Sequence, residues 1–436
     1  MDRRDFLKIS VGLAAGTPGL AGAQGGAAPA MTWRPEQGAK LRVLRWKAQV
    51  QGDEDAWTKN TAEFSRRSGI EVDVESDSWE EVRPRAAVAA GAGSGPDIVL
   101  STFDDASLYP EKLLDVTDLA EYLGRKYGGW VDVCRGYLRP DGRHWIGVPL
   151  GCAGSAIVYR VSHVRRAGFA DFPRDTAGFL ALCRALKANG HAVGFALGYS
   201  TGDANTWAHW LVWSFGGKLV DDRNKVVIDS AQTLRALEYA RELYQAFIPG
   251  TLAWQDAAND AAFLEERISL TANGVSIYAT AKNSPDPRLR ALAADIGHAR
   301  FPTGPVGRPT ELQVFLNQMI FKHTKYPNAA KEYLRFMMER EQYASWQRAS
   351  LGCVAAPLRG YESNAVWAGD PKLAPYRDCM EIMLPNSYSG NPGYASAQCM
   401  ADFVVVGMVA EAASGQRAPR EAAKRAQKRA AGYYRS

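Results

Sequence analysis

The first part of the chain alternates between the hydrophobic period of strands and that of helices. Residues 40–46, KLRVLRW, predict a strand, and residues 53–69 predict a helix that ends at Gly69. Residues 70–76, IEVDVES, alternate apolar and polar positions, and residues 97–102 predict a short apolar strand after a further helix. Strands joined by helices in this way favour a parallel α/β sheet with right-handed crossovers.

Polar and aromatic residues follow the three predicted strands. Ligands bind outside the carboxyl ends of the strands in a sheet of this kind. We therefore expect Trp46, Trp79 and Asp104 to form one wall of a cleft. For the two tryptophans, a place in the core or on the surface is an equal alternative.

A second α/β unit begins near residue 150. In residues 145–160, WIGVPLGCAGSAIVYR, Pro149 fixes one backbone dihedral, while Gly147 and Gly151 permit bending on either side. A helical pattern follows at residues 179–188. This order predicts a hinge strand that leads into a second lobe.

The stretch FLEERISLTANGVSIY, residues 263–278, carries the strongest prediction of binding residues. A helix leads into the strand ISLTA, and Asn273 and the following glycine then turn the chain. We expect Asn273, Ser276 and Tyr278 to project from the strand end toward a ligand, since binding residues concentrate in such loops. The alternative is a plain turn with a buried tyrosine.

The first 23 residues have the features of an export signal. Arg3 and Arg4 precede a weakly apolar run at residues 9–20 and the small residues Ala-Gly-Ala at 21–23, which resembles the bacterial twin-arginine signal. The resemblance implies a protein that folds before export and acts in the periplasm from Gln24 onward. Because Gln24 is not a cysteine, we expect no lipid anchor, and we expect no membrane-spanning stretch in the mature chain.

Composition narrows the class of protein. The 436 residues are 46% hydrophobic and 23% charged, which is enough for a large core and about two or three domains. A net charge of +5 is too small to indicate a nucleic-acid partner.

The six cysteines are far apart and show no metal-ligand spacing, so we expect neither a metal nor a redox site. In an oxidising compartment one or two disulfides can form, and Cys379 and Cys399 are the nearest candidates in sequence. Buried free thiols are the equal alternative.

Several segments, each weak alone, together resemble a known family in their order and spacing. The chain from about residue 40 onward resembles the extracellular solute-binding proteins of ABC importers, the group typified by maltose-binding protein. The segments that carry the resemblance are GPDIVL (95–100), residues 145–160, AGFADFPRDTAGFLALCRALKANG (167–190), WAHWLVWSFGGKLVDD (207–222), residues 263–278, FPTGP (301–305), KYPNAAKEYLRFM (325–337) and ASGQRAPREAAKRAQ (413–427).

The resemblance implies a two-lobed periplasmic-binding-protein fold of type II, in which each lobe is a mainly parallel sheet flanked by helices. The first lobe would comprise residues 38–149 with 303–350, and the second residues 150–302 with 351–436. Three hinge segments would join the lobes, which would close over a small carbohydrate and deliver it to a membrane permease. We expect a monomer without a cofactor.

Tryptophans at 207, 210 and 213 repeat at roughly helical spacing. We expect Trp210 and Trp213 in the core, whereas Trp207 begins the helix close behind Asp203 and is placed to meet a ligand. In the resembling sugar binders, aromatic faces stack on sugar rings and carboxylates bind hydroxyls, so Asp203, Trp207 and Trp254 suit a sugar site.

Two further residues are weaker candidates. Glu311 follows the proline-rich return between the lobes, although an ordinary exposed glutamate is the better interpretation. The loop SYSGNPGYAS, residues 387–396, could supply Tyr388 or Tyr394 to the cleft from the second lobe.

No catalytic motif is present: the sequence has no HExxH, no GxSxG and no P-loop. We therefore expect a binding protein and not an enzyme. The alternatives are a binder of a polyol, a glycerol phosphate or another small organic molecule, and an exported glycosidase, whose two carboxylates leave almost no sequence signal.

Overall fold

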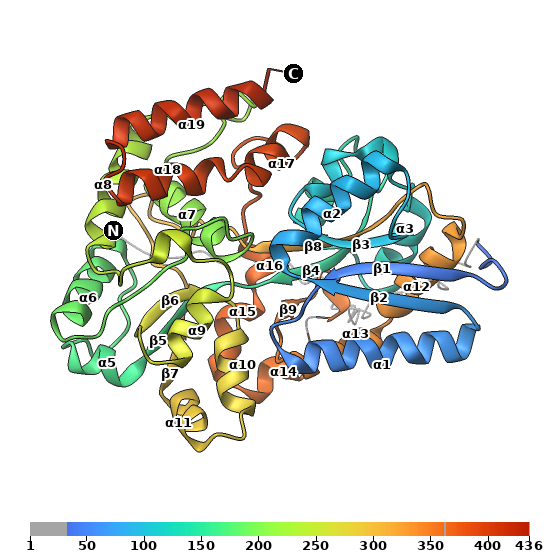
Figure 1. The fold of residues 1–436 in the computed structure, drawn as a ribbon, viewed down its shortest axis with the longest axis horizontal. Coiled ribbons are helices and arrows are strands. Elements are labelled where there is room, and N and C mark those ends of the chain that lie inside the picture. Colours follow the sequence, from blue (N-terminus) through green and yellow to red (C-terminus); the bar gives the residue numbers. More distant parts are fainter. Residues whose placement is uncertain (1–32, 362, 436) are drawn as a thin grey trace, which may run out of the picture.

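Two α/β lobes lie side by side in the computed structural model, which describes residues 33–361 and 363–435 (Figure 1). The two-lobed α/β architecture is as predicted. The predicted export signal at residues 1–23 lies outside the described residues.

The first lobe is built on a six-stranded sheet with the strand order β2-β1-β3-β8-β4-β9. Strand β1 pairs in parallel with β2 and β3, whereas β8 runs antiparallel to both β3 and β4, and β9 runs antiparallel to β4. The sheet is therefore mixed, because β8 enters it from the other lobe. The strands are β1 (Lys40–Trp46), β2 (Glu71–Asp77), β3 (Ile98–Thr102), β4 (Val148–Ala153), β8 (Val314–Ile320) and β9 (Val354–Ala355).

The sheet of the second lobe has the order β6-β5-β7, formed by β5 (Ala156–Arg160), β6 (Leu270–Asn273) and β7 (Ile296–Ala299). Both β6 and β7 pair antiparallel to β5, so the prediction of a mainly parallel sheet is wrong here. The strand–helix–strand pattern does make β6 and β7 parallel to each other, but β5 lies between them. The local sequence pattern therefore predicted the relative direction of β6 and β7 but not that each of them pairs with β5.

Helices of the first lobe cover both faces of its sheet (Figure 1). The end of the first helix is as predicted, since Gly69 caps it with a φ of 72° that favours glycine. Beneath that helix, the fully buried Arg45 guanidinium donates to Asp53 at 2.5 Å. The helices are α1 (Gln51–Ser68), α2 (Trp79–Ala92), α3 (Thr117–Lys126), α4 (Asp132–Leu138), α12 (Pro327–Met337) and α13 (Arg340–Ala349), with short 3₁₀ turns at Asp105–Leu108 and Pro110–Lys112.

The second lobe is richer in helices than in strands. A buried aromatic cluster lies under its helix α7, where Trp210 and Trp213 are about 98% buried, as predicted for core residues. The helices are α5 (Val161–Arg166), α6 (Thr176–Ala188), α7 (Asp203–Ser214), α8 (Ala231–Tyr244), α9 (Ala258–Leu264), α10 (Ser276–Asn283) and α11 (Pro287–Asp295), with a 3₁₀ turn at Thr251–Ala253.

Residues 366–393, here called the bridging segment, touch both lobes. The Tyr376 hydroxyl donates to the Gly274 carbonyl of the second lobe at 3.1 Å, and the Asn386 amide donates to Asp104 of the first lobe at 3.0 Å. Figure 1 shows its helices between the lobes. They are α14 (Val366–Gly369), α15 (Ala374–Arg377) and α16 (Cys379–Ile382), preceded by a 3₁₀ turn at Arg359–Tyr361 and joined by another at Pro371–Leu373.

The chain ends in α17 (Tyr394–Ala401), α18 (Val404–Ala413) and α19 (Pro419–Tyr433). Contrary to expectation, the stretch Tyr394–Ala413 is long and apolar enough, by length and composition, to cross a membrane. In the structure Asp402 and Phe403 break it into two helices, and α18 packs against α7, α8 and α19. Within Tyr394–Ala413, the most apolar run of 18 residues is 56% buried, as in the core helices of soluble proteins.

The six cysteines are free thiols. The suggested pairing of Cys379 with Cys399 is wrong, because Cys379 instead faces Cys152 of strand β4. Proximity in sequence did not indicate proximity in space, since Cys379 lies in the bridging segment and Cys399 in the C-terminal helices.

Candidate ligand-binding site

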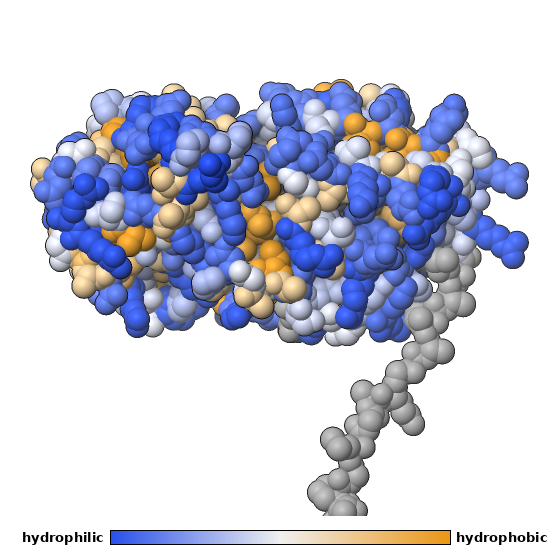
Figure 2. Space-filling view, turned by 90° about the horizontal axis from the view of Figure 1, so that it is seen from below, coloured by the Kyte–Doolittle hydropathy of each residue, from blue (hydrophilic) through white to orange (hydrophobic). Residues whose placement is uncertain are grey.

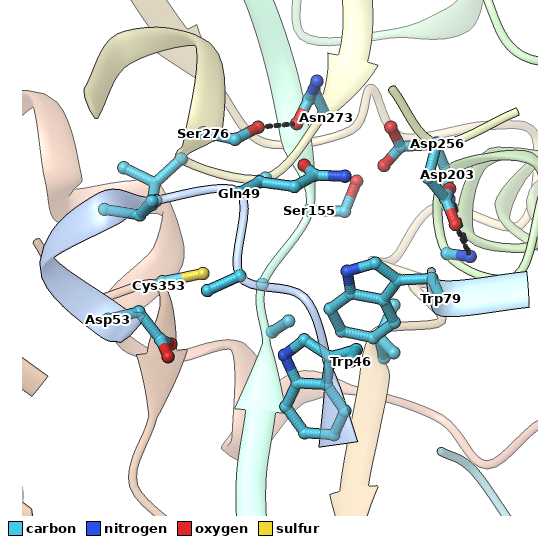
Figure 3. Close-up of a pocket in the computed structure, with 18 residues that line it drawn as sticks. Trp46, Gln49, Asp53, Trp79, Ser155, Asp203, Asp256, Asn273, Ser276 and Cys353 are labelled. Atoms are coloured by element: carbon cyan, nitrogen blue, oxygen red, sulfur yellow. Dashed lines mark hydrogen bonds between the residues drawn. The ribbon is translucent and has the colours of Figure 1, made fainter. Parts of the chain in front are cut away.

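A cavity opens where the two lobes meet, with about 600 Å³ of space not filled by atoms, including solvent at its mouth. Figure 2 views the molecule from below and shows apolar residues gathered between the two lobes, on a surface that is otherwise largely hydrophilic. Figure 3 shows that the side chains lining the cavity come from both lobes.

Trp46 and Trp79 form one side of the cavity, here called the aromatic wall. Trp46 is the last residue of β1 and Trp79 the first residue of α2, and their rings stack with centroids 4.7 Å apart and planes 23° apart (Figure 3). Ser78 fixes the start of α2 because its hydroxyl accepts from the Glu81 N–H. Trp46 and Trp79, which the sequence predicts to form one wall of a cleft, therefore line the cavity together.

The second lobe supplies the opposite side, here called the polar wall: Asp203, Asp256, Asn273 and Ser276. Asn273 ends β6 and Ser276 begins α10, and the Ser276 hydroxyl donates to the Asn273 Oδ1 atom at 2.9 Å (Figure 3). Asp203 begins α7 and accepts from the Asn259 amide at 2.8 Å. These hydrogen bonds hold the polar groups in place before a ligand arrives.

Asp256 has the most complete set of hydrogen-bond partners in the polar wall. Its carboxyl accepts from the backbone N–H groups of Gly202 at 2.9 Å and Asp203 at 2.7 Å, and from the Ser200 hydroxyl. Its own N–H donates to Glu80 of α2 at 3.4 Å. Because Glu80 belongs to the first lobe, this bond joins the two lobes at the edge of the cavity.

Buried carboxyls gather behind the polar wall. Burial raises the pKa of Asp260 to about 7, and the Asn273 amide donates to this carboxyl. Burial and the neighbouring carboxyls of Asp256 and Asp260 raise the pKa of Asp203 well above its usual range. The pKa values of Asp256 and Glu80 are also raised, chiefly by burial.

The lining has no basic side chain among the described residues. Its third carboxyl, Asp53, is paired with Arg45 and is therefore neutralised within the first lobe. The arrangement offers hydrogen-bond acceptors and a flat apolar surface, which together suit a polar molecule with an apolar face.

Sequence reasoning missed several lining residues: Gln49, Asp53, Ser155, Asp256 and Cys353. Ser155 lies in the connection from β4 to β5, and its N–H donates to Gln313 at 2.5 Å. The sequence predicts a hinge in residues 145–160, so Ser155 within it could also have been predicted as a site residue. Asp256 had no local signal, because it follows a 3₁₀ turn in an irregular loop.

Three predicted site residues of the second lobe do not line the cavity. The prediction that Trp207 meets a ligand is wrong: it is 1% exposed, and its indole N–H donates to the Ala196 carbonyl at 2.6 Å. Tyr278 is 5% exposed and donates to Asp370 at 2.6 Å. Trp254 is half-buried, and its ring lies against Gly194.

Three others are held in polar contacts away from the cavity. Asp104 is fully buried, and accepts from Asn386 and from the Ser396 hydroxyl of α17. Glu311 is 2% exposed and pairs with Arg300 at 3.3 Å, so it is not the exposed glutamate expected. The Tyr388 hydroxyl accepts from Arg308 at 2.5 Å, and its ring contacts Trp213.

Comparisons with known proteins agree with the two-lobed fold. A putative ABC transporter periplasmic-binding protein of Escherichia coli, YcjN, is 22% identical over 306 residues, which are 68% of this chain and 67% of YcjN. A solute-binding protein of Thermotoga lettingae bound to α-D-tagatose superposes with a TM-score of 0.77 at 16% identity, over 91% of this chain and 100% of that one. A sugar transporter from Arthrobacter chlorophenolicus with bound laminaribiose gives 0.76 at 17% identity, over 91% and 99%.

A family model places the chain within one protein class. The model of bacterial extracellular solute-binding proteins matches residues 59–375, which include the strands of both sheets except β1, Trp79 of the aromatic wall and the whole polar wall. The chain therefore belongs to the bacterial extracellular solute-binding protein family.

Proposed function

We propose that the protein is the solute-binding component of an ABC importer and that it captures a small carbohydrate in the cavity between its lobes. The observation that carries the proposal is the pairing of the stacked Trp46 and Trp79 rings with the carboxyls and amide of the polar wall. A pyranose presents an apolar face to an aromatic ring and directs its hydroxyls to polar groups at its edge. The tagatose- and laminaribiose-bound structures support the same class of solute.

The proposal extends to location and partners. The protein would be exported to the periplasm through the twin-arginine signal at residues 1–23, act there as an unanchored monomer, and present the closed form to a permease. Two lobes that close around a solute provide the two states that a permease can distinguish. The protein would bind its solute without changing it.

A thermal-shift screen of residues 24–436 against sugars, polyols and organic acids tests the proposal. A ligand that raises the melting temperature binds the folded state, and calorimetry should then show a one-to-one complex. The compound should be recovered unchanged after incubation with the protein, whereas turnover would indicate an enzyme. A screen in which organic acids bind and carbohydrates do not would exclude the sugar assignment.

A further inference from the structure

Two buried cysteines meet where the hinge strand passes the bridging segment. Cys152 lies in β4 and Cys379 begins α16, and their sulfur atoms are 2.8 Å apart although the residues are 227 positions apart in sequence. Both are fully buried. All six cysteines are within the described residues, and Cys152 and Cys379 are the pair whose sulfur atoms touch.

We propose that Cys152 and Cys379 form a disulfide when the protein is in an oxidising compartment. The oxidant would be a small-molecule or protein disulfide: its S–S bond breaks, the Cys152–Cys379 bond forms, and the two thiol protons leave on the oxidant's sulfurs. The two cysteines lose two electrons and the oxidant gains them. Both sulfurs are closed to solvent in the folded protein, so oxidation after export requires α16 to separate transiently from β4 and admit the oxidant.

The position gives the bond a structural consequence. Gly154, two residues after Cys152, lines the cavity, and a Cβ atom at Gly154 would lie 3.2 Å from the Cys379 sulfur. The cysteine pair therefore lies directly behind the cavity wall, at the first connection between the lobes. A disulfide here would fix the bridging segment to the hinge strand and would restrict the unfolded chain through a very long loop.

Thiol counting tests the proposal independently of the solute. Residues 24–436, refolded in a mixture of reduced and oxidised glutathione, are denatured without reductant, alkylated and weighed by mass spectrometry. We expect four alkylated cysteines and a cross-linked peptide that joins Cys152 to Cys379. Six alkylated cysteines, or a different cross-linked pair, would overturn the proposal.

Variants supply the control. C152S and C379S should each leave five alkylated cysteines, whereas C183S, which removes another fully buried thiol, should keep the cross-link and leave three. Reductant should lower the melting temperature of the wild type by several degrees and leave that of C152S unchanged. Equal melting temperatures of the oxidised and reduced wild type would show that the bond does not restrict unfolding.

Discussion

The two walls of the cavity hold their groups in different ways. The aromatic wall is positioned by packing: Trp46 is 3% exposed and supports the Trp79 ring, which faces the cavity. The polar wall is positioned by hydrogen bonds from Ser200, Gly202 and Asn259. The aromatic wall can accept any apolar ring face, whereas the polar wall has fixed acceptor positions and should discriminate between solutes.

The largest expected effect comes from a tryptophan that belongs to neither wall. Trp207→Ala should destabilise the protein by about 3–5 kcal/mol, because it opens a cavity among Phe195 and Phe247 in the core. Urea unfolding measures the loss. The affinity of the folded protein for its solute should not change. A Trp207→Ala variant that is stable but no longer binds the solute would show that Trp207 belongs to the binding site.

Trp79→Ala tests the aromatic wall. Losing roughly 100 Å² of apolar contact costs about 2–3 kcal/mol, which corresponds to a loss of affinity of roughly 30- to 150-fold. Calorimetry should show a similar loss for every solute that binds. Tyr394→Ala, which truncates a ring that is 51% exposed outside the cavity, is the control and should bind normally.

Asp203→Asn tests the polar wall. Replacing one carboxyl oxygen with an amide NH2 group removes a hydrogen-bond acceptor for the solute, at a cost of about 1.5 kcal/mol or roughly tenfold in affinity. Unlike the loss of Trp79, this change should reorder the solutes, since only those with a hydroxyl at Asp203 are affected. The exposed Asp222→Asn is the matched control, and an equal loss for all solutes would contradict the assigned role of the polar wall.

The last prediction concerns the pH dependence of stability and not the affinity for a solute. The pKa of Asp260 is raised to about 7 in the folded protein, so its contribution to stability is present below the unfolded pKa and falls as the pH rises toward 7. Asp260→Asn removes this titration. The free energy of unfolding of the variant minus that of the wild type should therefore increase between pH 4 and pH 8, and a difference that is constant with pH would exclude the shift.

The site residues that could be predicted lie at the ends of β1 and β6 and at the starts of α2, α7 and α10, and the one on α7 is Asp203. Trp46, Trp79, Asn273 and Ser276 were found because strand ends are recognisable in sequence and sheets bring them to one edge. The prediction that Tyr278 faces the ligand is wrong because of helix geometry. Helix α10 begins at Ser276, and two positions along a helix rotate a side chain by about 200°, which turns Tyr278 away from the cavity.

The depth at which a side chain is buried, and its packing against distant segments of the chain, could not be predicted from the sequence pattern. Asp203 and Trp207 lie on similar sides of α7, but one helical turn, about 5.4 Å, takes the tryptophan from the cavity into the core. Asp104 looked like a cleft carboxylate at the end of β3, yet the chain returns nearly 300 residues later with Ser396 and buries it. That return depends on the whole fold and has no local signal.

The broken helix pair Tyr394–Ala413 bears on how the chain can cross a membrane. If the chain were threaded across unfolded, this apolar stretch would reach the lipid without the tertiary contacts that bury it, as a segment able to stop there. A chain that crosses already folded keeps α18 packed against α7 and α8 and presents no such segment. The arginine pair at positions 3 and 4 predicts export in the folded state, in which this stretch would not be retained in the membrane.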